Sequence, residues 1–264
     1  MYGTGWTEAM AVVAACGIAL IATPAGISGA VLLLPFQVSV LGTPSPAVTP
    51  TNLLYNVIAT PGALYRYRRQ HQTGGRLTLL LMAGTLPGVI AGSVIRVKLI
   101  PGPKIFDLVV SAVLLPLGAW LAATRPARPA GPARPARHIP SPILIGLACL
   151  VGCVGGIYGT GGGFILSPVL IGAGRPAADV APAALTSTFV TSMAGVATFI
   201  TLAAGHPGSV VPDWPIGTAL GLGGLAGAYT GARIQARLPD ILIRRTIGIL
   251  AIVLGIRYLW SGLS

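Results

Sequence analysis

Two glycine-rich clusters, each inside a long apolar stretch, contain the residues best suited to bind a small solute. Glycine readily adopts positive φ angles, so each cluster can reverse the chain and leave backbone N–H groups uncovered at the start of the next helix. Such N–H groups bind anions. We therefore predict two anion-binding hairpin tips; the alternative is that the glycines only let helices pack closely. The clusters are Gly26, Ile27, Ser28, Gly29 and Ala30, and Gly159, Thr160, Gly161, Gly162 and Gly163.

Uncharged polar side chains follow each cluster, near the start of the next apolar stretch. Thr51 with Tyr55, and Asn52 with Asn56, are four residues apart, so each pair shares one face of a helix. Hydroxyl and amide groups can replace the water shell of an anion without burying a full charge. We predict that they complete the site; an interhelical hydrogen bond is the alternative role for each. The selected residues are Thr51, Asn52 and Asn56, then Thr186 and Ser187, within the wider polar sets 49–56 and 186–192.

Catalysis and metal binding have little support in the sequence. The chain has only five acidic residues and three histidines, with no His/Asp/Glu cluster or Ser/His/Asp set in an apolar stretch. We therefore expect no enzyme, no metal and no cofactor. Cys149 and Cys153 are one helical turn apart and are expected to pack, with a sulfur-handling enzyme or membrane subunit as the alternative. Asp107, near the end of a stretch, is the acid to test for proton coupling.

Composition predicts the elements that position these residues. Hydrophobic residues form 53% of the 264-residue chain and charged residues 8%, whereas soluble domains carry about 25% charged residues. The net charge of +12 comes from short basic clusters between apolar stretches, as in membrane loops, and not from a nucleic-acid surface. A span needs about 20 apolar residues. We therefore predict an all-α protein of the lipid bilayer, with apolar stretches at 7–41, 46–65, 77–95, 105–123, 142–173, 180–203, 215–232 and 240–260.

Two of these stretches, 7–41 and 142–173, are too long for one span, and each contains one of the glycine clusters. A polar Arg/Pro/Ala-rich linker, 125–141, separates a first repeat (1–124) from a second (142–264). Three landmarks recur in the same order. Gly26 and the later Pro35 align with Gly159 and Pro168 at an offset of 133, Thr51-Asn52 with Thr186-Ser187 at 135, and the packing pair Gly88/Gly92 with Gly227/Gly231 at 139.

The basic residues predict the topology, because Lys and Arg favour cytoplasmic loops. If 142–173 crosses once, the basic residues divide 9 inside to 8 outside; if it enters and returns, 13 of the 17 lie inside. The second topology is preferred. Each repeat is then a glycine-broken helical hairpin plus three transmembrane helices, and the two repeats are inverted. We expect a multi-pass protein of the bacterial inner membrane, with the linker 125–141 in the cytoplasm.

These features resemble the TauE/SafE sulfite exporter family. The resemblance rests on the two glycine turns followed by proline, the downstream Thr-Asn and Thr-Ser pairs, and the two four-segment halves, with the best match at 159–168 and 183–187. The first half differs, since Ser28 and Ala30 stand where the second has Gly161 and Gly163. The resemblance implies transport of sulfite, thiosulfate or a small organosulfonate, driven by an ion gradient.

Together these observations predict a secondary transporter in which one half rocks against the other and exposes the tips alternately. Its partner is then a small sulfur-containing anion, and the tips with the Thr/Asn residues hold it. Two alternatives remain at this point: an anion channel that uses the same tips, and a transporter of another small anionic solute.

Overall fold

The computed structural model describes residues 4–69, 75–100, 103–123, 139–173, 175, 177–205, 210–234 and 240–263, and every regular element in them is a helix. The predicted all-α class is therefore confirmed for this part of the chain. Most of the predicted linker lies outside the described residues. The helices are α1 (Thr4–Ala22), η1 (Thr23–Ala25), α2 (Ala30–Ser39), α3 (Ser45–Arg69), α4 (Gly75–Lys98), α5 (Pro103–Ala123), α6 (Ser141–Tyr158), α7 (Gly163–Gly172), α8 (Ala177–Ala203), α9 (Trp214–Ile234) and α10 (Asp240–Leu263).

Several helices have the length and composition of membrane spans. Within the described residues, four are long and apolar enough to cross a bilayer. The helix α2 and a part of α5 are apolar but shorter. Helices suit this environment because they satisfy their own backbone hydrogen bonds where no water is available. The four segments are Gly5–Ala22, Gly75–Lys98, Ser141–Tyr158 and Asp179–Ala203.

Both long apolar stretches are broken at their glycine clusters, as predicted. After α1 and η1 the chain turns at Gly26, which has φ +68°, and α2 begins at Ala30. After α6 it turns at Gly159 and Gly161, with φ of +84° and +68°, and α7 begins at Gly163. The helices α2 and α7 have 10 residues each, a length of about 15 Å, or half of the roughly 30 Å hydrocarbon core. Each stretch is therefore a full-length helix followed by a half-length one.

Glycine rows bring two pairs of helices into backbone contact. A Cβ atom built on Gly88 of α4 would overlap the carbonyl oxygen of Cys149 in α6. One built on Gly227 of α9 would overlap the carbonyl oxygen of Cys16 in α1 in the same way. Glycine at these positions allows dispersion contacts along both helices, which is how membrane helices associate without a hydrophobic driving force. The predicted packing role of these glycines is confirmed.

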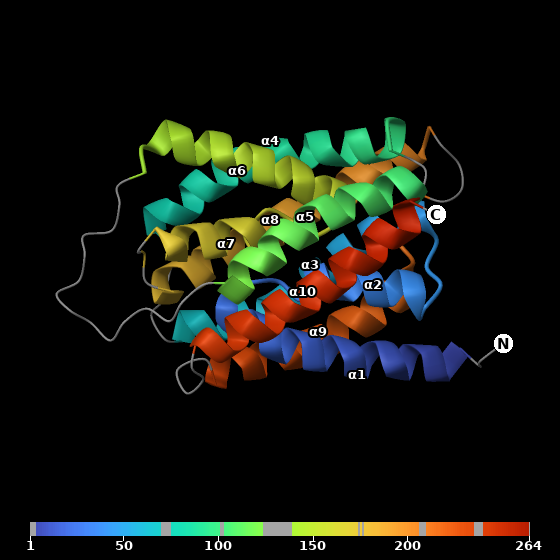
Figure 1. The fold of residues 1–264 in the computed structure, drawn as a ribbon, viewed down its shortest axis with the longest axis horizontal. Helices are drawn as coiled ribbons and strands as arrows, with labels where there is room; N and C mark the ends of the chain where they lie inside the picture. Colours follow the sequence, from blue (N-terminus) through green and yellow to red (C-terminus); the bar gives the residue numbers. More distant parts are fainter. Residues whose placement is uncertain are drawn as a thin grey trace.

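The remaining contacts complete the bundle. The pair α4 and α6 lies along one edge of the molecule and the pair α1 and α9 along the opposite edge (Figure 1). Between these edges, α3 and α8 contact one another; α9 also packs on α3, and α4 on α8. The half-length helices sit against these central helices, α2 on α3 and α7 on α8, while α5 packs on α10. Both hairpin tips therefore face the central pair, α3 and α8.

Candidate functional site

The first tip lies against the polar face of α3. The hydroxyl of Ser28 donates to Oδ1 of Asn56 and accepts the backbone N–H of Ala30 at 3.2 Å. Asn56 is fully buried, and its Nδ2 group has no hydrogen-bond partner among the described residues. The hydroxyl oxygen of Tyr55 lies 2.6 Å from the position of a Cβ on Gly29, so the tip fits closely against α3. Asn56 thus presents a buried amide donor beside the start of α2.

Asn52 connects the two tips. Its Nδ2 donates to the carbonyl oxygen of Ala30 at 2.9 Å, and its Oδ1 accepts from Nε2 of Gln37 at 3.0 Å. On its other side, a Cβ built on Gly159 would lie 3.1 Å from the Cβ of Asn52 and 2.5 Å from the carbonyl oxygen of Thr49. The first tip is therefore bonded to Asn52, and the second tip is in van der Waals contact with it. The two glycine clusters, far apart in sequence, meet on one turn of α3.

The second tip lies against α8. The N–H of Gly163 donates to Oγ1 of Thr188 at 3.1 Å. A Cβ on Gly161 would lie 3.1 Å from Oγ of Ser192. That hydroxyl is fully buried and has no partner in the part of the chain that the structure describes. Beside each tip there is therefore a buried polar group with no partner among the described residues: the Asn56 amide at the first and the Ser192 hydroxyl at the second.

The middle of the second tip is closed off by α4. A Cβ on Gly162 would lie 2.5 Å from the Cβ of Thr85, so this position has no room for a side chain. The Oγ1 atom of Thr85 lies 2.8 Å from Oγ of Ser187, within hydrogen-bond distance, and also donates to the carbonyl oxygen of Leu81. Thr160 is fully buried. Ser187 is thus placed at this tip, held by a hydroxyl of the other half of the chain.

Two of the predicted residues make their hydrogen bonds elsewhere. Thr51 donates to the carbonyl oxygen of Ala47 at 2.7 Å and accepts the N–H of Asp213 at 2.8 Å, which ties α3 to the residue preceding α9. Thr186 donates to the carbonyl oxygen of Pro182 at 2.7 Å. Threonine hydroxyls often bond to the carbonyl four residues earlier in a helix. Composition alone does not reveal which threonines do so.

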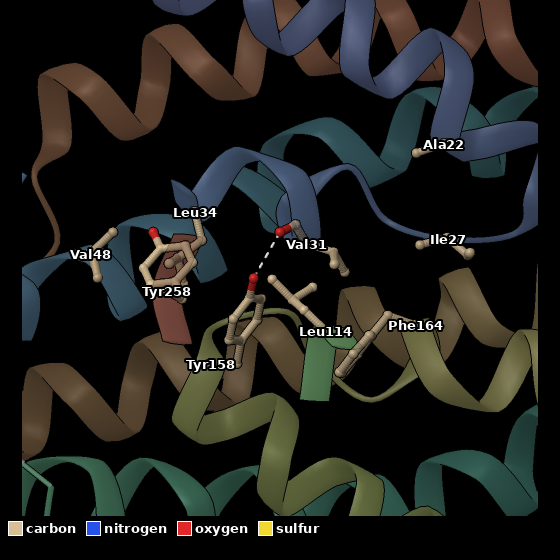
Figure 2. Close-up of a cluster of buried hydrophobic side chains, with 9 residues drawn as sticks. All are labelled: Ala22, Ile27, Val31, Leu34, Val48, Leu114, Tyr158, Phe164 and Tyr258. Atoms are coloured by element: carbon tan, nitrogen blue, oxygen red, sulfur yellow. Dashed lines mark hydrogen bonds between the residues drawn. The ribbon is translucent and has the colours of Figure 1, made fainter. Parts of the chain in front are cut away.

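A tyrosine at the end of α6 also bridges the hairpins. The hydroxyl of Tyr158 donates to the carbonyl oxygen of Val31, in the first turn of α2, at 2.9 Å (Figure 2). That carbonyl would normally accept from residue 35, but Pro35 has no N–H. The tyrosine thus satisfies a backbone group that the proline leaves without its helical donor. The ring of Tyr158 stacks on Phe164 of α7, with centroids 6.2 Å apart.

Several residues that lie near the tips could not be singled out from the sequence. Thr188 and Ser192 belong to the predicted polar set but were not selected, because a sequence does not show which face of α8 meets the tip. Gln37 is a single amide in an apolar run, and this isolated polar residue could have marked it as a candidate. Tyr158 directly precedes the glycine turn, and its position alone could have marked it as a candidate.

Metal chemistry is not supported within the described residues, where no group of three or more His, Cys, Asp or Glu could hold a metal ion. The thiols of Cys16, Cys149 and Cys153 are free and partly buried. The tips are lined by backbone, hydroxyl and amide groups, and such a lining suits a small polar or anionic solute.

Comparison with protein families identifies the chain. A family model described as sulfite exporter TauE/SafE matches residues 10–258. The chain belongs to the sulfite exporter TauE/SafE family. Comparisons with curated proteins and with solved structures found no match. Membership in the TauE/SafE family implies a multi-pass membrane exporter of the sulfite type, since this is a family of transporters. The match includes both tips and the polar faces of α3 and α8 on which they meet.

Proposed function

We propose that this chain is a secondary transporter of a small sulfur-containing anion: sulfite, thiosulfate or an organosulfonate. The observation that carries the proposal is the meeting of both glycine tips at Asn52. Beside each tip is a buried donor, Asn56 Nδ2 or Ser192 Oγ, with no partner in the described part of the chain. Family membership supports the anion class. Transport is coupled to an ion gradient and proceeds by alternating access.

The anion is held mainly by side-chain donors. The first N–H group of each half-length helix already has a partner, Ser28 for Ala30 and Thr188 for Gly163. We therefore assign the direct contacts to Asn56 and Ser192. The dipoles of α2 and α7 add partial positive charge at the same place. The glycines serve to bring these groups within reach of one small ligand.

Uncharged donors suit a carrier, because the solute must be released after it is bound. An oxyanion accepts several hydrogen bonds, so hydroxyl, amide and helix-terminal groups together can replace its water shell. A full charge in direct contact would bind more strongly and slow release. This reasoning favours an oxyanion with several acceptor oxygens over a halide, which has no directional acceptors.

We also propose that the two halves, 1–124 and 142–264, are inverted repeats joined by a cytoplasmic linker in a bacterial inner membrane. The helix contacts support this. Cys16 in α1 packs on Gly227 in α9, and Cys149 in α6 packs on Gly88 in α4. The cysteines are 133 positions apart and the glycines 139, the same offsets that relate the landmarks in the sequence. Each half therefore packs its third long helix, α4 or α9, against the hairpin of the other half, as expected for a pseudo-twofold arrangement.

Alternating access requires that contacts around the two tips be remade. The bonds from Asn52 to Ala30 and from Tyr158 to Val31 join the two hairpins to each other and to α3. In the proposed cycle, opening of one side breaks part of this set while the glycine interfaces α1/α9 and α4/α6 move as units. The hinge lies where the tips meet.

The test uses the full chain in proteoliposomes. Thiosulfate, sulfite, methanesulfonate, sulfate and chloride are compared as solutes, with and without proton and sodium gradients. Saturable, gradient-dependent uptake of a reduced sulfur oxyanion or the sulfonate, with little uptake of chloride, would support the proposal. A current that does not saturate and needs no counter-ion would favour an anion channel. No uptake of any of these anions, in protein shown to be folded, would refute the sulfur-anion assignment.

A further inference from the structure

Arg96, in the last turn of α4, is a buried cation. Its side chain is 1% exposed, and Asp107 is the other charged residue in the buried class among the described residues. Removing a charge from water costs several kcal/mol unless partners compensate for it. Ionisable residues that face the interior of a transmembrane bundle generally mark solute or ion pathways. The site described above uses only uncharged groups, so this charge needs an explanation of its own.

The guanidinium group of Arg96 is connected to the second tip. Its Nε donates to Oγ1 of Thr49 at 3.3 Å, and the same hydroxyl donates to the carbonyl oxygen of Ile157 at 3.1 Å. Ile157 lies two residues before Gly159, which itself packs on the backbone of Thr49. One threonine hydroxyl therefore separates the positive charge from the backbone that leads into the tip.

A second buried polar group lies on the same face of α4. Ser93 is three residues before Arg96, is fully buried, and has an Oγ atom with no partner among the residues described. Its backbone nitrogen would lie 2.9 Å from a Cβ on Gly156, so this part of α4 packs directly on the end of α6. A polar face of α4 is thus directed at the segment that carries the second tip.

Helix capping explains only part of this arrangement. Arg96 also donates to the carbonyl oxygen of Ile100, and cations near a helix C-terminus are favourable. That role would be satisfied at an exposed position and does not require a contact with α3. The charge of Arg96 also interacts with that of Asp107 in α5, whose Oδ2 accepts from Ser261 in α10 at 2.9 Å. Asp107 therefore offsets part of the positive potential.

We propose that Arg96 is the fixed positive charge of the anion pathway and sets its preference for dianions over monoanions. It acts on the second tip through Thr49, as a positioning residue. This inference rests on the proposed function and deepens it, because it specifies the charge of the preferred solute. A dianion interacts twice as strongly with a fixed charge as a monoanion in the same place. At an effective dielectric constant of about 20, a unit charge placed about 12 Å from the anion would contribute roughly tenfold to monoanion affinity and roughly a hundredfold to dianion affinity.

The experiment measures binding of thiosulfate, a dianion, and methanesulfonate, a monoanion, to the purified full chain. Arg96→Gln should weaken methanesulfonate binding roughly tenfold and thiosulfate binding roughly a hundredfold. Arg233→Gln is the matched control, since it removes one positive charge from the last turn of α9, where the side chain is exposed. It should change neither affinity. Arg96→Lys keeps the charge and should keep the ratio of the two affinities close to that of the wild type.

Two results would overturn the inference about Arg96 and leave the proposed function standing. In both, the wild type binds the two probes, and Arg96→Gln weakens the two affinities equally or does not weaken them. A general structural role would produce equal weakening, because it does not distinguish ligand charge. If Arg96→Gln does not fold, Asp107→Asn is the deciding variant. Loss of the offsetting negative charge should raise the preference for thiosulfate over methanesulfonate. An unchanged ratio of the two affinities would refute the role of Arg96. If the wild type binds neither probe, the proposed function fails as well, and the two failures are thereby distinguished.

Discussion

The hydroxyl of Tyr158 donates to the carbonyl of Val31 at 2.9 Å, four residues before the proline that cannot supply the usual helical donor. A side chain of the second half thus completes a backbone hydrogen bond in the first. The proline and the tyrosine are therefore coupled: the absence of an N–H at position 35 leaves a carbonyl that the hydroxyl at position 158 can reach. This coupling can be measured.

Tyr158→Phe should lower stability by about 1–3 kcal/mol, because it leaves a buried carbonyl without a partner. Pro35→Ala restores an N–H to α2, so the double variant should lose less stability than the two single changes predict. The measurement is a double-mutant cycle of thermal or denaturant unfolding in detergent. Strict additivity would contradict the coupling.

Ser192→Ala should separate binding from folding. The hydroxyl has no partner within the described ranges, so its removal should leave the melting temperature unchanged or slightly higher. If the hydroxyl binds the anion, thiosulfate affinity should fall roughly tenfold to a hundredfold, as expected for a hydrogen bond to a charged group. The neighbouring Thr191→Val is the control, because that hydroxyl bonds within its own helix to the carbonyl oxygen of Ser187 at 2.7 Å. Equal affinities in the wild type and Ser192→Ala would remove Ser192 from the site.

Gly159→Ala should be strongly destabilising, by more than about 2 kcal/mol, because two effects add. The residue has φ +84°, and a Cβ there would meet the carbonyl oxygen of Thr49 at 2.5 Å. Gly146→Ala, inside the helix α6 that ends just before Gly159, should be neutral or stabilising, since nothing lies within 4 Å of its added carbon. Melting temperatures of the two variants test this; a similar loss in both would contradict the tip geometry.

Gly88→Ala and Gly227→Ala should destabilise the protein by similar amounts, about 1–3 kcal/mol each, because both would push a Cβ into a carbonyl of the facing helix. Gly17→Ala on α1 has open space around it and is the control. The comparison also bears on the proposed repeat. A large effect at one interface with none at the other would argue that the halves are not equivalent.

The sequence was sufficient to predict the helices, because a bilayer requires long apolar helices and glycine clusters interrupt them. The apolar stretch 46–65 became α3 (Ser45–Arg69), and 142–173 became α6 and α7, divided at Gly159. The roles of individual hydroxyls could not be predicted, since these depend on helix rotation and on which carbonyl is nearest. Thr51 bonds to the residue preceding α9, whereas Ser192 reaches a tip.

Arg96 is a second residue whose environment the sequence does not reveal. Hydropathy ends the apolar stretch at 95, which assigns Arg96 to the polar flank of a span. In the structure it belongs to the last turn of α4 and is buried by contacts with α3. The contact with Thr49 joins α4 to a helix that is distant in the sequence, and no local pattern in the chain records such a contact.

The half length of α2 and α7 has a consequence for energetics across the membrane. If water enters up to each tip, the transmembrane voltage falls across the thin layer where the tips meet and not across the whole bilayer. A displacement of a few ångströms would then carry the anion through most of the electric field, which is worth about 2.3 kcal/mol per unit charge at 100 mV. With ten-residue helices, a small displacement of the anion would therefore involve nearly the same electrical work as its movement across the whole bilayer.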